Sequence, residues 1–204
     1  MVKLRKIGLD LDNTIIDYGP SYRAIASEMG FPQQLVNRES IREALRKSDE
    51  DDEEWQRFQS ILYTDGLEYA RPAPGLISFL RLCEFMGVIT TIISHKTQST
   101  PARFGSRDLR APASEWLYIH GIVPTYVAPE RVFFCDDQTA KVRMVALTQC
   151  DLFVDDLTEV LIHPDMAEAI TRVRYVAGAR SETGKLDGIV DADFLALSEW
   201  LRSC

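Results

Sequence analysis

The stretch that decides the fold is Ile7–Thr14, which reads IGLDLDNT. It begins as an apolar run of the kind that forms a buried strand, and it carries the carboxylates of Asp10 and Asp12. In an open parallel sheet, ligands bind beyond the carboxyl ends of the strands. We therefore expect one carboxylate to be placed to attack a ligand and the other to move protons. The alternative is that both are turn or cap residues.

Further apolar runs follow along the chain, and helical patterns separate them. The strand-like runs are Val88–Ile93, Arg131–Cys135, Leu152–Val154 and Arg172–Val176. The helical patterns are Pro74–Gly87, Ser114–His120, Ala140–Gln149 (with Thr139 as expected cap) and Phe194–Arg202 (with Asp191 as expected cap). Strands that alternate with helices predict an α/β fold, a doubly wound, Rossmann-like parallel sheet covered on both faces.

The stretch from residue 17 to residue 73 interrupts this alternation. It holds three helical patterns, Ser21–Met29, Arg38–Lys47 and Glu53–Tyr63, and no strand-like run. We expect residues 17–73 to form a small helical insert after the first strand, and residues 1–16 and 74–204 to form the α/β core. The acidic run Asp49–Glu54 is expected to be a solvated helix start capped by Ser48.

The net charge and the composition limit the classes of partner that are expected. The 204 residues carry a net charge of −8, so neither nucleic acid nor an anionic membrane surface is an expected partner. The apolar runs are too short for a membrane span, and the N-terminus lacks a signal-peptide pattern. The four cysteines form no C-x-x-C pair and fit buried thiols in a reducing cytoplasm. The sequence leaves the oligomeric state open.

Ser94 and Lys141 are candidate phosphate-binding residues. Ser94 follows a strand-like run, and a hydroxyl in such a turn, with nearby backbone N–H groups, binds phosphate oxygens. Lys141 begins a helix, where its charge opposes the helix dipole, so a buried anion would explain it. A turn or cap role for Ser94 and simple surface exposure for Lys141 are the alternatives.

Two aspartate pairs follow strand-like runs and compete as a metal site. Asp155 and Asp156 follow Leu152–Val154, and adjacent carboxylates at a strand end suit Mg²⁺, which prefers hard oxygen ligands. The pair Asp136-Asp137 also ends an apolar run. We favour Asp155-Asp156 because this order leaves Lys141 on an element of its own between Ser94 and the metal pair.

Taken in order, D-x-D-x-T at residues 10–14, then Ser94, Lys141 and Asp155-Asp156, the sequence resembles the phosphatase branch of the haloacid dehalogenase (HAD) superfamily. The resemblance covers about residues 4–16 and 74–160, and the insert lies where such enzymes often carry a helical cap. It implies a Mg²⁺-dependent hydrolase that removes phosphate from a small phosphorylated metabolite. Carbon–halogen hydrolysis is not expected, because relatives with that activity lack the acid that Asp12 supplies.

The resemblance also implies roles for single residues. Asp10 would be the nucleophile that forms an aspartyl-phosphate, and Asp12 the general acid/base whose backbone carbonyl also binds Mg²⁺. Ser94 would hydrogen-bond the phosphoryl group, and Lys141 would neutralise its charge. The implied metal ligands are Asp10, Asp12, Asp156 and Asp155, the last either through water or as a positioning group for Lys141.

Substrate contacts are expected at Ser94 and at its neighbours His95 and Lys96. Two other functions stay open at this point. A phosphotransferase or phosphomutase would pass the phosphoryl group from the same intermediate to another hydroxyl. A non-catalytic module would bind a phosphorylated ligand without turning it over.

Overall fold

The computed structural model describes residues 4–32, 34, 37–46, 52–179 and 188–203. They form two compact units. The first lies within Met1–Ile16, Pro72–Lys96 and Leu117–Cys204, and the second within Asp17–Arg71 and Thr97–Trp116. The second unit therefore contains Thr97–Trp116 in addition to residues 17–71 of the stretch expected as a helical insert, and the last two residues of that stretch lie in the first unit.

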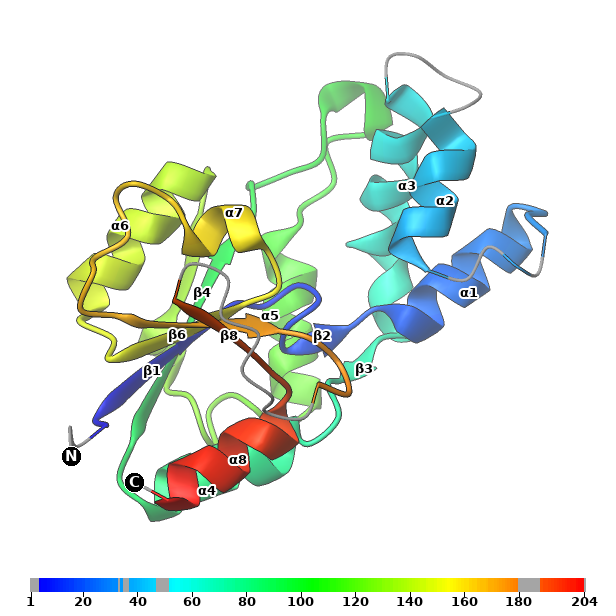
Figure 1. The fold of residues 1–204 in the computed structure, drawn as a ribbon. Helices are drawn as coiled ribbons and strands as arrows, with labels where there is room; N and C mark the ends of the chain where they lie inside the picture. The colour runs from blue at the N-terminus through cyan, green and yellow to red at the C-terminus, as the bar shows by residue number, and fades with distance from the viewer. Residues whose placement is uncertain (1–3, 33, 35–36, 47–51, 180–187, 204) are drawn as a thin grey trace. The chain divides into compact units, whose positions relative to one another are not determined.

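Six described strands form one parallel sheet in the first unit, in the order β5-β4-β1-β6-β7-β8 (Figure 1). They are β1 (Lys6–Leu9), β4 (Ile89–His95), β5 (Val132–Cys135), β6 (Leu152–Asp155), β7 (Thr171–Tyr175) and β8 (Ile189–Ala192). The α/β parallel sheet predicted from the alternating pattern is confirmed. Strand β8 was not predicted, because two strongly apolar residues are too short a pattern to read as a strand.

Helices cover both faces of this sheet. In Figure 1, α6 (Gln138–Thr148) and α7 (Thr158–Leu161) lie on one face, and α4 (Leu76–Phe85) and α8 (Phe194–Ser203) lie on the other. Helix α5 (Arg110–Ile119) and the short helix η3 (Pro129–Arg131) precede β5. Buried apolar side chains of β4, β6, α6 and α7 form one continuous core, as expected for a sheet with two covered faces.

The N-caps of two helices differ from the prediction. Helix α6 is capped by Asp137, whose side chain accepts a backbone N–H in the first turn, and not by Thr139. Helix α8 is preceded by Asp193, which accepts two backbone N–H groups of the first turn. Asp191 instead forms an ion pair with Arg174. In both helices, the aspartate directly before the first residue accepts backbone N–H groups that have no partner within the helix.

Close packing at the centre of the sheet requires glycine at position 8. A Cβ atom on Gly8 would lie 2.7 Å from Cδ2 of Phe153 and 2.9 Å from Sγ of Cys150. Gly8 and Phe153 are direct partners in the parallel ladder between β1 and β6. The missing side chain therefore lets the Phe153 ring pack over β1.

Three described helices of the second unit confirm the three helical patterns of the insert. They are α1 (Gly19–Glu28), α2 (Arg38–Arg46) and α3 (Glu53–Leu62), and short helices η1 (Asp65–Glu68) and η2 (Ala102–Phe104) accompany them. Stacked rings of Tyr22, Phe58 and Trp55 form their core. The predicted cap Ser48 lies outside the described residues.

Strands β2 (Ile16–Asp17) and β3 (Arg71–Pro72) form a separate two-stranded sheet. Among the described residues, no helix combines the length and apolar character that a bilayer crossing needs.

Candidate active site

The carboxyl ends of β1 and β6 carry a buried aspartate each. Leu9 and Val154 are partners in the parallel register, so the residues that follow them, Asp10 and Asp155, lie side by side. The backbone N–H of Asp10 donates to the carbonyl of Val154 at 2.9 Å, which continues the ladder by one step. Both side chains are almost fully buried.

Lys141 joins these two carboxylates. It lies in the first turn of α6, next to the carboxyl ends of the strands, and only 2% of it is exposed. Its Nζ lies 2.5 Å from Oδ1 of Asp10 and 2.6 Å from Oδ2 of Asp155. The Lys141 side chain is therefore held at the strand ends by two ion pairs, which explains a lysine so near the helix start.

Burial is the largest influence on the pKa values of Asp10 and Asp155. It raises the pKa of Asp10 well above its ordinary value; Lys141 opposes the rise, and the carboxylates of Asp155, Asp156 and Asp12 add to it. The pKa of Asp155 is also raised by burial, again against Lys141. Burial would lower the pKa of Lys141, but Asp10 and Asp155 outweigh it and raise that pKa.

The cluster offers oxygen ligands for a cation. Oxygen atoms of Asp10, Asp155 and Asp156 all lie within 4.8 Å of one another. With Asp12 they make four carboxylates, and among the described residues the ammonium groups of Lys141 and Lys96 lie in ion pairs with them. Hard oxygen donors with this excess of negative charge fit a divalent cation such as Mg²⁺.

The two aspartates at the end of β6 are not equivalent. Oδ1 of Asp155 accepts the backbone N–H of Leu157 at 2.9 Å, and Oδ2 forms an ion pair with Lys141 at 2.6 Å but meets no hydrogen-bond criterion among the described residues. Asp156 is only partly buried. Asp155 is therefore the aspartate that contacts Lys141, and Asp156 is the more exposed of the two. Asp137, from the rival pair, caps α6.

Ser94 is wholly buried in β4, and its Oγ has no hydrogen-bond partner among the described residues. The same is true of Oγ1 of Thr14, in the loop after Asp12. A buried hydroxyl without a partner is costly and rare, so each can accept or donate a hydrogen bond to a bound ligand. Thr14 was not predicted as a site residue, although its place in the opening motif was the signal.

The neighbours of Ser94 take different positions. His95 ends β4 and is exposed, which leaves it accessible to a ligand. The Nζ of Lys96 lies 2.8 Å from Oδ2 of Asp12. The prediction for Lys96 did not foresee this contact, because sequence order alone does not show that β4 and β1 are neighbours.

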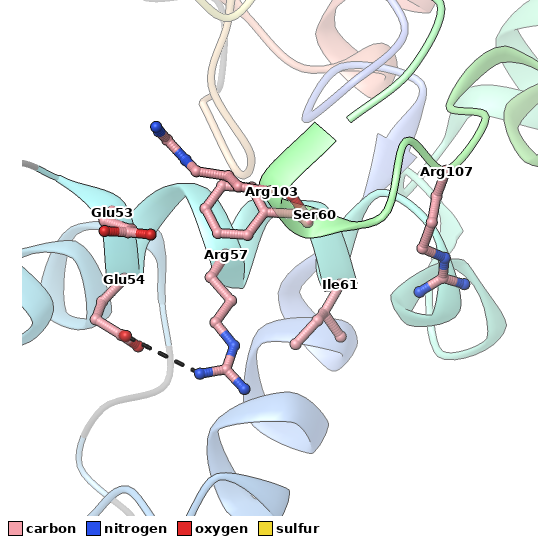
Figure 2. A pocket seen from close by; sticks show the side chains of 8 residues that line it. Glu53, Glu54, Arg57, Ser60, Ile61, Arg103 and Arg107 are labelled. Carbon is pink, nitrogen blue, oxygen red and sulfur yellow. Dashed lines mark ion pairs between the residues drawn. The ribbon is translucent and has the colours of Figure 1, made fainter. Parts of the chain in front are cut away.

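A cavity of about 390 Å³ lies within the second unit, and Figure 2 shows three arginines on its walls. Each arginine has a polar partner in the same unit. Arg107 forms a bidentate ion pair with Asp65, and Arg103 donates a hydrogen bond to Gln56. A guanidinium nitrogen of Arg57 lies 4.0 Å from a carboxylate oxygen of Glu54. The first two contacts bind the segment 97–116 to the helices of the second unit, so we interpret these arginines as structural.

Comparisons with known proteins point to one fold. No family model and no curated protein matches the chain. Solved structures do match over nearly the whole length. A HAD-superfamily hydrolase from Ehrlichia chaffeensis is 14% identical, with a TM-score of 0.56 over 100% of this chain and 98% of its own.

Two other solved structures are 16% identical and cover 98% of this chain and 99% of their own. One is a protein described as a predicted phosphoglycolate phosphatase, from Haemophilus somnus, with a TM-score of 0.55. The other is Protein Tyrosine Kinase A from Mycobacterium tuberculosis, with a TM-score of 0.64. The chain thus has the fold of the HAD-superfamily hydrolases and phosphatases, as the motifs predicted.

Proposed function

We propose that this protein is a Mg²⁺-dependent phosphomonoesterase that acts on a small phosphorylated metabolite through an aspartyl-phosphate. The observation that carries the proposal is the placement of Lys141 between Asp10 and Asp155, beside Asp156. An attacking carboxylate repels a phosphate dianion, so a site for this reaction needs fixed positive charge next to the nucleophile. Lys141 supplies that charge on the Asp10 carboxylate.

The reaction proceeds in two displacements. In the first, an oxygen of Asp10 bonds to phosphorus while the bond from phosphorus to the leaving oxygen breaks, and Asp12 gives its proton to that oxygen. In the second, Asp12 takes a proton from water, whose oxygen bonds to phosphorus and releases Asp10 and inorganic phosphate. Covalent catalysis of this kind divides one difficult step into two easier ones. Ser94 hydrogen-bonds the phosphoryl group throughout.

The cation would be held by Asp10, Asp156 and the backbone carbonyl of Asp12, with Asp155 holding Lys141 in place. When bound, Mg²⁺ offsets the negative charge of the phosphoryl group and of the surrounding carboxylates. Lys141 supplies the rest of the positive charge that offsets the phosphoryl group and the carboxylates.

For the substrate, we propose a small phosphomonoester in contact with His95, which is exposed directly beside Ser94. The net charge of −8 supports a small metabolite over a nucleic acid or a membrane surface. A reducing, cytoplasmic location is supported by the described cysteines Cys83, Cys135 and Cys150, which are buried and lie outside any disulfide.

A phosphotransferase is the second candidate, favoured by the likeness to a solved protein tyrosine kinase. It would use the same residues up to the aspartyl-phosphate and then pass the phosphoryl group to a second hydroxyl in place of water. Transfer to an added acceptor that exceeds the release of free phosphate would establish it.

The decisive experiment measures phosphate release from a panel of phosphomonoesters and an aryl phosphate, with Mg²⁺ and with EDTA. Asp10→Asn is compared with the wild type, and circular dichroism checks that both are folded. We expect metal-dependent release that falls by roughly 10⁴-fold or more in the variant. Mass spectrometry of the quenched reaction should locate the added phosphate on Asp10.

Three results would count against the proposal. Full turnover by Asp10→Asn would exclude Asp10 as the nucleophile, and full turnover in EDTA would exclude the metal. No release from any substrate, together with tight binding of a phosphorylated ligand, would identify a non-catalytic binding module.

A further inference from the structure

Lys96 is a second buried lysine at this sheet edge. It follows β4 directly, and its backbone N–H donates to the carbonyl of Cys135 at 2.9 Å, which fixes where its side chain begins. The side chain is only 2% exposed, and its Nζ lies 2.8 Å from Oδ2 of Asp12. The side chain of Asp12 is 16% exposed, so the ion pair is largely removed from water.

Each of the two buried lysines therefore contacts a different carboxylate of the opening motif. Lys141 pairs with Asp10 and Lys96 with Asp12. A buried ammonium group is costly unless it is paired, so the Lys96 ammonium depends on its contact with Asp12. This contact therefore also holds the two side chains in one arrangement. A lysine ammonium only donates hydrogen bonds, which makes Oδ2 of Asp12 an acceptor in this pair.

We propose that Lys96 is a positioning residue, which fixes the carboxyl group of Asp12 so that its other oxygen, Oδ1, carries the proton to the leaving group. This inference rests on the proposed function, in which Asp12 is the general acid/base. When phosphorus separates from the leaving oxygen, the proton passes from Oδ1 to that oxygen. In the second displacement, Oδ1 takes a proton from water, and Lys96 keeps its own protons throughout.

The proposal separates Lys96 from the expected substrate contacts. A lysine that binds the phosphoryl group helps every phosphate ester alike. A lysine that acts through the general acid matters most when the leaving oxygen needs a proton. Alkyl phosphates need that proton, whereas 2,4-dinitrophenyl phosphate leaves readily without it, so the two roles predict different dependence on the leaving group.

The test measures kcat/KM for a series of phosphate monoesters from alkyl phosphates to 2,4-dinitrophenyl phosphate. This parameter reports formation of the phosphoenzyme and is unaffected by its later hydrolysis. Asp12→Asn should lose roughly 10²–10⁴-fold on alkyl phosphates and far less on the dinitrophenyl ester, because general acid catalysis supplies about that factor. Lys96→Met should show the same selectivity, with an alkyl loss at least about tenfold larger than the dinitrophenyl loss.

Two further variants complete the test. The double variant with Asp12→Asn and Lys96→Met should lose little more than Asp12→Asn alone, because both changes remove the same proton transfer. Lys6→Met is the matched control, since Lys6 pairs with the Thr148 carbonyl at the other end of β1 and should leave the selectivity unchanged. If Lys96→Met does not fold, Lys96→Gln serves in its place; it keeps an N–H donor, so a smaller loss with the same selectivity is expected.

An equal loss of kcat/KM on all esters by the Lys96 variant would overturn the proposal and indicate that Lys96 contacts the substrate. A Lys96 variant with the same kcat/KM values as the wild type across the series would also overturn it. Failure of the proposed function looks different: the wild type itself would release no phosphate, or Asp12→Asn would show no dependence on the leaving group.

Discussion

Lys141 and Asp10 form a buried ion pair across 131 positions of the chain, with 2.5 Å between Nζ and Oδ1. The same ammonium lies 2.6 Å from Oδ2 of Asp155. A buried ion pair of this kind is a poor source of net stability, because desolvation opposes the Coulombic gain. Its presence at the carboxyl ends of β1 and β6 fits the proposed reaction, which needs a charged nucleophile next to a fixed cation.

Replacement of Lys141 tests that relationship. Lys141→Met leaves two buried carboxylates without their ammonium, so we expect a loss of about 3–5 kcal/mol in the free energy of unfolding. We also expect kcat to fall by roughly 10²–10³-fold, the cost of removing one fixed stabilising group. Urea unfolding and phosphate release measure the two effects. Arg143→Met, an exposed position on the same helix, should change neither; unchanged turnover of Lys141→Met would remove Lys141 from the mechanism.

Ser94→Ala should separate activity from stability. Its Oγ has no partner among the described residues, so the free energy of unfolding should change by less than about 0.5 kcal/mol. A lost hydrogen bond to a charged phosphoryl group is worth about 1.5–3 kcal/mol, which predicts a loss of roughly 10- to 150-fold in kcat/KM. Ser198→Ala is the control, because that hydroxyl donates to the carbonyl of Phe194 within α8. Equal kcat/KM values for Ser94→Ala and wild type would contradict the role.

Metal removal tests the choice between the two aspartate pairs. Mg²⁺ at one hundred times its Kd should stabilise the folded protein by about 2.7 kcal/mol relative to the protein in EDTA. The shift in Tm, measured calorimetrically, should be reduced in Asp156→Asn and retained in Asp136→Asn. The reverse pattern would assign the metal to the Asp136-Asp137 pair.

The ion pair of Asp65 and Arg107 predicts a pH-dependent contribution to stability in the second unit. A hydrogen bond from Arg107 lowers the pKa of Asp65 below its ordinary value, although both side chains are largely exposed. A carboxyl group with a lowered folded pKa stabilises the fold above its unfolded pKa of 3.8, and that contribution is lost as the pH falls through the folded value.

The coupling free energy of Asp65→Asn and Arg107→Met measures this contribution. Because solvent screens the pair, we expect less than about 1 kcal/mol at pH 7 and less still at pH 3. Urea unfolding followed by tryptophan fluorescence provides the values. A coupling that grows on acidification would contradict the assignment.

The sequence by itself determined the class of fold. Continuous apolar runs such as Leu152–Val154 are buried on both faces, and only a covered parallel sheet accommodates several of them. The order of the motifs also singled out Asp10, Lys141 and Asp155 as candidates, and the structure brings these three side chains into contact. These signals are local, and local pattern is what a sequence displays directly.

Tertiary structure decided which charges meet. The strand order β4-β1-β6 puts the ends of three strands that are distant in the chain next to one another. It thereby allows Lys96 to pair with Asp12, and Lys141 to pair with both Asp10 and Asp155. The chain path also places Thr97–Trp116 in the second unit, where Arg103 contacts Gln56 and Arg107 contacts Asp65. Such contacts depend on strand order and chain path, which the periodicity of a single segment does not encode.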